Sequence, residues 1–237
     1  MKSFLKLPIL LISMSLIIVS CRKSNDELKM IPKNALVIVH VNLKSLAGKL
    51  SWEDIKQTTW FKEIQSDTAM GSWAKKVMDS PGNSGIDLSE GLIIFAQKPP
   101  GTHGQIVVEG ELKDTKAFEE FNKNLDGKSA TVKDGDIKTL AIEKAVVGWN
   151  EKKFAYVISS PSTAANVNFT QDSLNTITLP VDDVQKLSLA CKNLFVLHAD
   201  SSMSKVNKFS GLLKEDGDIH VWQNNEEMVK VPDKWEC

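Results

Sequence analysis

The sequence predicts an α+β fold with a mainly antiparallel sheet and helices packed on one face. Short β-branched runs follow one another between residues 130 and 159, with turn signals between them, which is typical of an antiparallel meander. Apolar residues spaced three and four apart occur before and after those runs, not between each pair of them. The regular alternation of a parallel βαβ sheet is therefore missing.

The amino terminus reads as an export signal. Lys2 and Lys6 give it a basic start, and residues 7–19 form an almost wholly apolar run. At about 1.5 Å per residue that run is too short to cross a hydrocarbon core of about 30 Å, but it fits a signal peptide. Ser20 and Cys21 follow directly and resemble the bacterial lipobox, a small residue before a cysteine. We therefore expect a lipoprotein signal peptide over residues 1–20 and lipid attachment at Cys21.

Lipid on Cys21 would make the membrane a partner of the chain. Two or three acyl chains give a stable anchor, whereas one gives marginal binding. The expected location is the cell envelope, with the chain anchored in the outer membrane and either facing the periplasm or displayed on the surface. Residues 21–32 are predicted to be a solvated tether, because residues 22–29 are charged and unpatterned. A plain secreted protein with a chance cysteine, or an uncleaved anchor, is the alternative.

Residues 33–160 are predicted to form the α+β domain. A strand is expected at 35–42, where a β-branched run follows a Pro-Asn turn signal, and a helical segment follows with Ser51 as an N-cap. Asp114 is expected to cap a second helix. The other strands are expected at residues 91–97, 105–112, 130–133, 137–142, 145–149 and 154–159.

The remaining chain is predicted to hold a linker and the start of a second unit. Residues 161–179 are small and polar, as in a linker or long loop. Residues 180–237 begin a second α+β unit that stops incomplete, because the strand at 218–222 has no partner near it in sequence. Cys191 lies on the apolar stripe of the helix that begins this unit, where a free cysteine packs as a small hydrophobe. A disulfide between Cys191 and Cys237 is the alternative.

Three short stretches carry a resemblance to a known family. They are IPKNA at residues 31–35, AVVGWN at 145–150 and GDIHVWQN at 217–224. Together they resemble a Bacteroidota lipoprotein family known only as a domain of unknown function, of which this chain would be a shortened member. The resemblance implies a lipid anchor and an envelope location. It brings no activity and no catalytic residues.

No catalytic, metal or cofactor motif is found in the sequence. The four histidines have no His, Cys or carboxylate at metal-ligand spacing, so each is expected to be structural or merely exposed. Neither a P-loop nor a nucleophile elbow is present. A net charge of -1 argues against a nucleic-acid partner. The histidines are His40, His103, His198 and His220.

The expected function is that of a non-enzymatic binding or structural module held at the membrane. Six tryptophans suggest one alternative, a surface glycan- or peptide-binding lipoprotein that uses exposed aromatic rings, although core packing is their commoner use. An enzyme with a site assembled from residues distant in sequence is the other alternative. The tryptophans are at positions 52, 60, 73, 149, 222 and 235.

Overall fold

The fold is known from a computed structural model, which describes most of the chain after residue 27. The predicted signal peptide, Cys21 and the first part of the tether lie outside the described residues, as does the predicted linker from residue 161 to 179. The described residues are 28–66, 75, 81–99, 102, 104–126, 129–142, 145–160 and 181–229.

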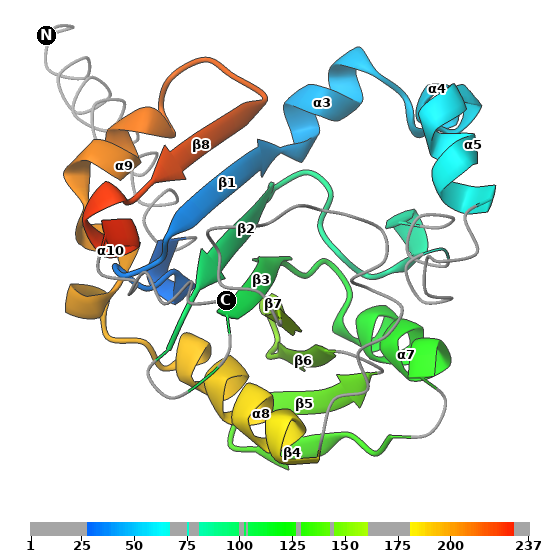
Figure 1. Cartoon of the computed structure of the whole chain (residues 1–237). Coiled ribbons are helices and arrows are strands. Elements are labelled where there is room, and N and C mark those ends of the chain that lie inside the picture. The colour runs from blue at the N-terminus through cyan, green and yellow to red at the C-terminus, as the bar shows by residue number, and fades with distance from the viewer. Residues whose placement is uncertain are drawn as a thin grey trace, which may run out of the picture.

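The centre of the fold is an eight-stranded sheet in the order β4-β5-β6-β7-β3-β2-β1-β8 (Figure 1). Neighbouring strands all run antiparallel. The predicted α+β class and antiparallel sheet are confirmed. The strands are β1 (Val37–Asn42), β2 (Gly91–Gln97), β3 (Gly104–Glu111), β4 (Val132–Asp134), β5 (Ile137–Ile142), β6 (Ala145–Trp149), β7 (Lys153–Ser160) and β8 (Ile219–Gln223).

The helices are mostly short, and two of them begin at the predicted caps. Ser51 accepts a hydrogen bond from the Asp54 N–H at the start of α4, and Asp114 accepts two at the start of α7. The α-helices are α3 (Leu43–Lys49), α4 (Trp52–Gln57), α5 (Thr59–Ser66), α7 (Thr115–Asp126), α8 (Val181–Phe195), α9 (Asn207–Leu212) and α10 (Asn225–Val229). The 3-10 turns are η2 (Leu28–Met30), η3 (Pro81–Asn83), η6 (Ala199–Ser201) and η7 (Met203–Lys205).

Helices cover both faces of the sheet, which corrects the expectation of one covered face. Cys191 of α8 packs in a core with Val146 and Ala155. Phe118 of α7 packs in a second core with Val147. Side chains of neighbouring strand residues point to opposite faces, so Val146 and Val147 place α8 and α7 on opposite sides of β6. All five residues of β6 are accordingly buried.

The last strand belongs to the same sheet and does not start a second unit. β8 pairs with β1 in an antiparallel register that sets Val39 opposite Val221. The helix that was expected to begin the second unit, α8, packs on β5, β6 and β7 of the same sheet. The partner of β8 is thus β1, a strand nearly two hundred residues earlier. Local sequence patterns do not predict a pairing between strands so far apart.

The end of the predicted tether is part of the core, which is a second correction. Leu28 and Ile31 are fully buried and Met30 is nearly so. The Ile31 carbonyl accepts a hydrogen bond from the Met203 N–H at 2.8 Å. These apolar residues lie within or directly after the charged stretch at residues 22–29, so the sequence pattern did not indicate that they are buried. The core therefore already includes Leu28, the first residue that the structure describes after the signal peptide, five residues before the predicted domain boundary.

We expect Gly148→Ala to destabilise the fold. A Cβ at this position would lie 2.5 Å from Cys191 Sγ and 3.1 Å from a Phe195 ring carbon, and such overpacking typically costs about 1–3 kcal/mol. Urea unfolding of the purified chain measures the loss. In the double variant with Cys191→Ala the loss should be smaller than the sum of the two single losses, because the sulfur that obstructs the Cβ is gone.

Gly48→Ala is the matched control, since a Cβ there meets nothing within 4 Å. It should leave the stability unchanged or raise it by up to about 1 kcal/mol, because Gly48 lies within α3. Equal effects at the two glycines would contradict the close packing of α8 on β6.

Candidate functional site

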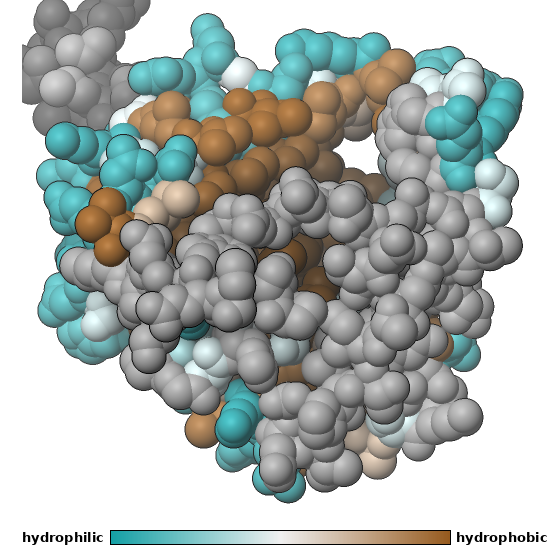
Figure 2. All heavy atoms as spheres, in the orientation of Figure 1, coloured by the Kyte–Doolittle hydropathy of each residue, from teal (hydrophilic) through white to brown (hydrophobic). Residues whose placement is uncertain are grey.

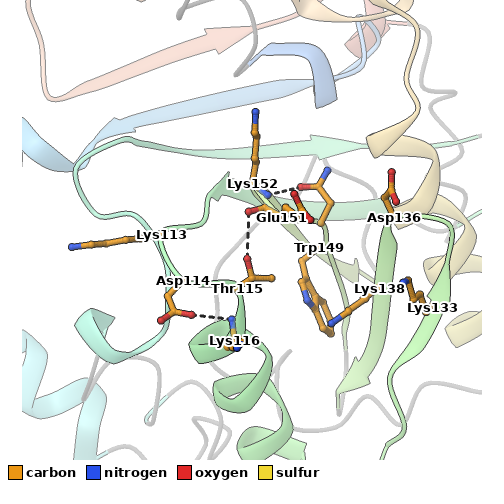
Figure 3. A pocket seen from close by; sticks show the side chains of 11 residues that line it. Lys113, Asp114, Thr115, Lys116, Lys133, Asp136, Lys138, Trp149, Glu151 and Lys152 are labelled. Carbon is orange, nitrogen blue, oxygen red and sulfur yellow. Dashed lines mark hydrogen bonds between the residues drawn. The ribbon is translucent and has the colours of Figure 1, made fainter.

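A wide concave site lies at one end of the sheet. It has a volume of about 800 Å³. The β4–β5 hairpin, the β6–β7 turn and the start of α7 meet around it (Figure 3). Its size falls in the usual range for small-molecule sites, about 300–1,000 Å³. We call it the lysine pocket because five lysines line it: Lys113, Lys116, Lys133, Lys138 and Lys152.

Local hydrogen bonds fix the walls of the lysine pocket. Asp114 Oδ1 accepts from the N–H groups of Lys116 and Ala117 at 2.9 and 3.0 Å, and so caps α7. In the β6–β7 turn, Asn150 Oδ1 accepts from the Lys152 N–H at 2.9 Å. The Thr115 hydroxyl donates to the Glu151 carbonyl at 3.3 Å, which ties the turn to the helix. The backbone that carries these lysines is therefore held in place.

The lysine pocket carries an excess of positive charge. Three acids line it beside the five lysines, and Asp114 is already engaged as the helix cap. Lys138 pairs with Glu119 outside the lining, at 2.5 Å. Hydrogen bonds from Lys123 and Lys138 hold the pKa of Glu119 below its usual value. The other four lysines form no ion pair with any residue that the structure describes.

Trp149 forms the floor of the lysine pocket. Its side chain is fully buried, and its ring meets Phe118 edge-on at a centroid distance of 5.9 Å. Lys138 ends beside the ring, whereas Lys113 and Lys152 extend away from the rim (Figure 3). Trp149 Nε1 has no hydrogen-bond partner among the described residues. Because the ring is buried, it cannot stack on a ligand, and it serves only as part of the packed base of the pocket.

A second polar site brings together two histidines that are far apart in sequence. His40 on β1 and His220 on β8 are directly opposite in register, and their Nδ1 atoms lie 3.3 Å apart. Both side chains are buried. His220 Nε2 lies 3.1 Å from the Glu215 carbonyl, which only accepts. We therefore assign the proton of His220 to Nε2, so that His220 Nδ1 accepts from the Nδ1–H of His40.

The surroundings of the histidine pair are tightly packed and disfavour protonation of His40. Gly91 lies so close that a Cβ there would be 2.5 Å from His40 Nε2. Burial, and then the charge of His220 when protonated, lower the pKa of His40. In the part of the chain that the structure describes, no group of three or more His, Cys, Asp or Glu is placed to hold a metal ion.

A family model described as "Domain of unknown function (DUF4836)" matches residues 28–233. The chain belongs to the DUF4836 family. The match begins where the buried core begins, at Leu28, and runs through both predicted units, in agreement with a single sheet. The resemblance to a domain of unknown function is thereby confirmed. No curated protein and no solved structure matches the chain.

The remaining residues singled out in the sequence of this DUF4836 member have varied environments. Cys191 is free and buried, as expected, and burial raises its pKa to about 12. His198 lies beyond the end of α8, with its side chain 79% exposed. Trp52 packs edge-on against Phe61. The side chains of His103, Trp60, Trp73, Trp235, Cys21 and Cys237 lie outside what the structure describes.

None of the described helices is both long and apolar enough to span a membrane. The sequence signals had missed the lysine pocket and the histidine pair. Each is assembled from strands and turns that only the sheet brings together. The five lysines that line the pocket lie between residues 113 and 152 of the sequence, but the sequence does not indicate that they meet. They do so because the sheet brings the two hairpins side by side.

We expect acidification to weaken this fold through the histidine pair. The pKa of His40 is lower in the folded chain than in the unfolded chain, so between those two values the unfolded chain binds more protons. The contribution of His40 is therefore complete above the unfolded pKa of about 6.5 and is lost as the pH falls through the folded pKa. Urea unfolding at pH 7.5 and pH 5.0 measures this loss.

His40→Gln should flatten the pH dependence relative to the unsubstituted chain. His198→Gln is the control, because that side chain is exposed, and it should leave the dependence as it is. If both variants kept the full dependence, His40 would not be its source.

Proposed function

We propose that this DUF4836 member is a lipid-anchored cell-envelope protein whose folded part is a non-enzymatic binding module for an anionic ligand. The observation that carries the binding role is the lysine pocket, where four lysines without ion pairs surround a site of ligand size. The pocket is the site, and Cys21 is the anchor.

The anchor rests on the order of segments at the amino terminus. A basic start, an apolar run over residues 7–19 and the pair Ser20-Cys21 stand in the order that lipoprotein processing requires. The matched family domain begins only at residue 28, so Cys21 lies outside it. This supports processing at Cys21 without loss of any residue from the core. It agrees with the envelope location that the family resemblance implies, for which we propose the outer membrane, on either face.

The charge of the lysine pocket favours ligands with more than one negative group. Lysine ammonium groups act as point charges with rotatable donors, and they suit carboxylate, sulfate or phosphate equally. Lys113, Lys116, Lys133 and Lys152 come from three separate backbone segments around the site. A ligand with several charges therefore engages more of them than a single ion does. Acidic oligosaccharides have this chemistry and fit the volume of the site.

Lipid attachment should depend on Cys21 alone. In a bacterial host fed with labelled palmitate, the full chain should take up label and sediment with membranes. Cys21→Ser should abolish both, because no other thiol stands after an apolar run. Cys237→Ser is the control and should keep both. If Cys21→Ser still takes up palmitate, the anchor proposal is wrong, whatever the pocket binds.

Ligand binding should depend on the lysine pocket. Calorimetry of the detergent-solubilised chain should detect trigalacturonate binding that weakens with added salt, and no binding of neutral maltotriose. Replacing both Lys133 and Lys152 with Gln should weaken binding about 2- to 30-fold, since each exposed ion pair contributes about 0.2–1 kcal/mol. Asp136→Asn should strengthen binding, because it removes a repelling charge from the lining.

Lys44→Gln with Lys208→Gln is the matched control, because both lysines are exposed and lie outside the pocket. It should leave the affinity unchanged. Inorganic triphosphate serves as a second anionic probe, so that binding of triphosphate without trigalacturonate would assign the site to phosphate. Equal losses in the pocket and control variants would mean that binding reflects net charge only, and the proposed site would be rejected.

A further inference from the structure

The outer edge of β8 pairs with no other strand in the part of the chain that the structure describes. β8 is the last strand of the sheet, and only its inner edge pairs, with β1 (Figure 1). The Asn42 N–H donates to the Asp218 carbonyl at 2.7 Å, and the Asn224 N–H donates to the Leu36 carbonyl at 2.8 Å. In an antiparallel pair, residues facing the partner strand alternate with residues facing away. The N–H and C=O groups of residues 219, 221 and 223 therefore point outward, away from β1.

This edge lacks the features that usually prevent strand pairing. Charged residues, proline or a bulge protect most natural edges, and the residues of β8 include none of these. The opposite edge, β4, has Lys133 and Asp134 within its three residues. On β8 the side chains of Ile219 and Val221 are 57% and 59% exposed. Hydrophobic residues gather over β8 and β1 on the face that Figure 2 shows.

The edge is complementary to a second copy of itself. If a two-fold axis passes beside Val221, Val221 lies opposite its own copy and Ile219 lies opposite Gln223 of the second copy. Residues 219, 221 and 223 are the ones whose backbone groups point away from β1. In this register, each of their N–H groups would donate to a carbonyl of the second copy. The same patch serves both copies, as closed two-fold symmetry requires. The exposed apolar side chains then continue across the junction on one face.

Charges at the two ends of β8 are also compatible with this pairing. Lys49 bonds Asp218 at the start of the strand and is 64% exposed. Glu226 lies in the first turn of α10, just after the end of the strand. An antiparallel pair brings the start of one β8 to the end of the other. Lys49, Glu215 and Asp216 of one copy would then lie at the end nearer Glu226 of the other copy. The paired residues of β8 include no Asp, Glu, Lys or Arg, so no like charges stand opposite each other within the pairing.

We propose that two copies of this chain associate through β8, antiparallel and centred on Val221, so that their sheets join into one. The inference is independent of the lysine pocket, which lies at the β4–β5 end of the sheet. It is also independent of the anchor, although two copies on one membrane would meet at a higher local concentration.

Disulfide trapping tests the register. In the full chain with Cys237→Ser, Val221→Cys should form a disulfide-linked dimer under mild oxidation, because directly opposite residues have Cα atoms about 5.5 Å apart, within the disulfide range of about 4.4–6.8 Å. Ile219→Cys is the matched control. It would be displaced from its own copy by about 13 Å along the strands, and should link far more slowly.

The molecular mass of the detergent-solubilised protein, from light scattering corrected for detergent, tests the association itself. The unsubstituted chain should be dimeric and Val221→Lys monomeric, with urea unfolding to verify that the variant is folded. Val132→Lys on β4 should remain dimeric. A monomeric unsubstituted chain would overturn the proposal. Equal rates of disulfide formation at positions 219 and 221 would also overturn it. Such rates would mean that the copies collide at random and do not pair in the proposed register.

Discussion

The fold depends most on the burial of β6 from both sides. Gly148 leaves room on one face for Cys191 of α8, whose Sγ lies 3.6 Å from the Ala155 carbonyl. On the other face, Trp149 and Phe118 interlock edge to face. A strand covered on both faces must be apolar throughout, and the sequence AVVGW meets that requirement with one residue small enough for a helix to approach closely. Both helices are thus positioned by the same five residues.

The backbone around the lysine pocket is held in place by the packing of β6 and α7. Its floor is Trp149, the last residue of β6, and its walls are the turn that follows and the start of α7. Tyr156 on β7 donates to Asn122 of α7 at 2.7 Å, which fixes the helix against the neighbouring strand. A ligand therefore meets flexible lysine side chains mounted on a fixed backbone. Binding there requires little reordering of the backbone, and this limits its entropic cost.

Local features were predicted well from the sequence because their causes are local. Gly135 adopts a positive φ of 59° in the tight turn between β4 and β5, where a turn signal was expected, and the β5 and β6 boundaries agree with those expected. Features that need distant partners were not predicted. His40 and His220 are 180 residues apart, and nothing local to either one indicates the other. The side of the sheet taken by α7 was missed for a related reason, since periodicity gives the buried stripe of a helix but not the face that it covers.

The buried start of the domain sets how close an anchored chain is held to the membrane. Leu28 and Ile31 cannot leave the core without exposing apolar surface, at about 25 cal/mol per Å². If the chain is anchored at Cys21 as proposed, at most residues 22–27 are left to act as a tether. Fully extended, at about 3.3–3.6 Å per residue, it reaches no more than about 25 Å. With the proposed anchor, the domain would stay within its own diameter of the lipid. Two copies paired through β8 would then need their two-fold axis near the membrane normal, because both tethers must reach the same surface.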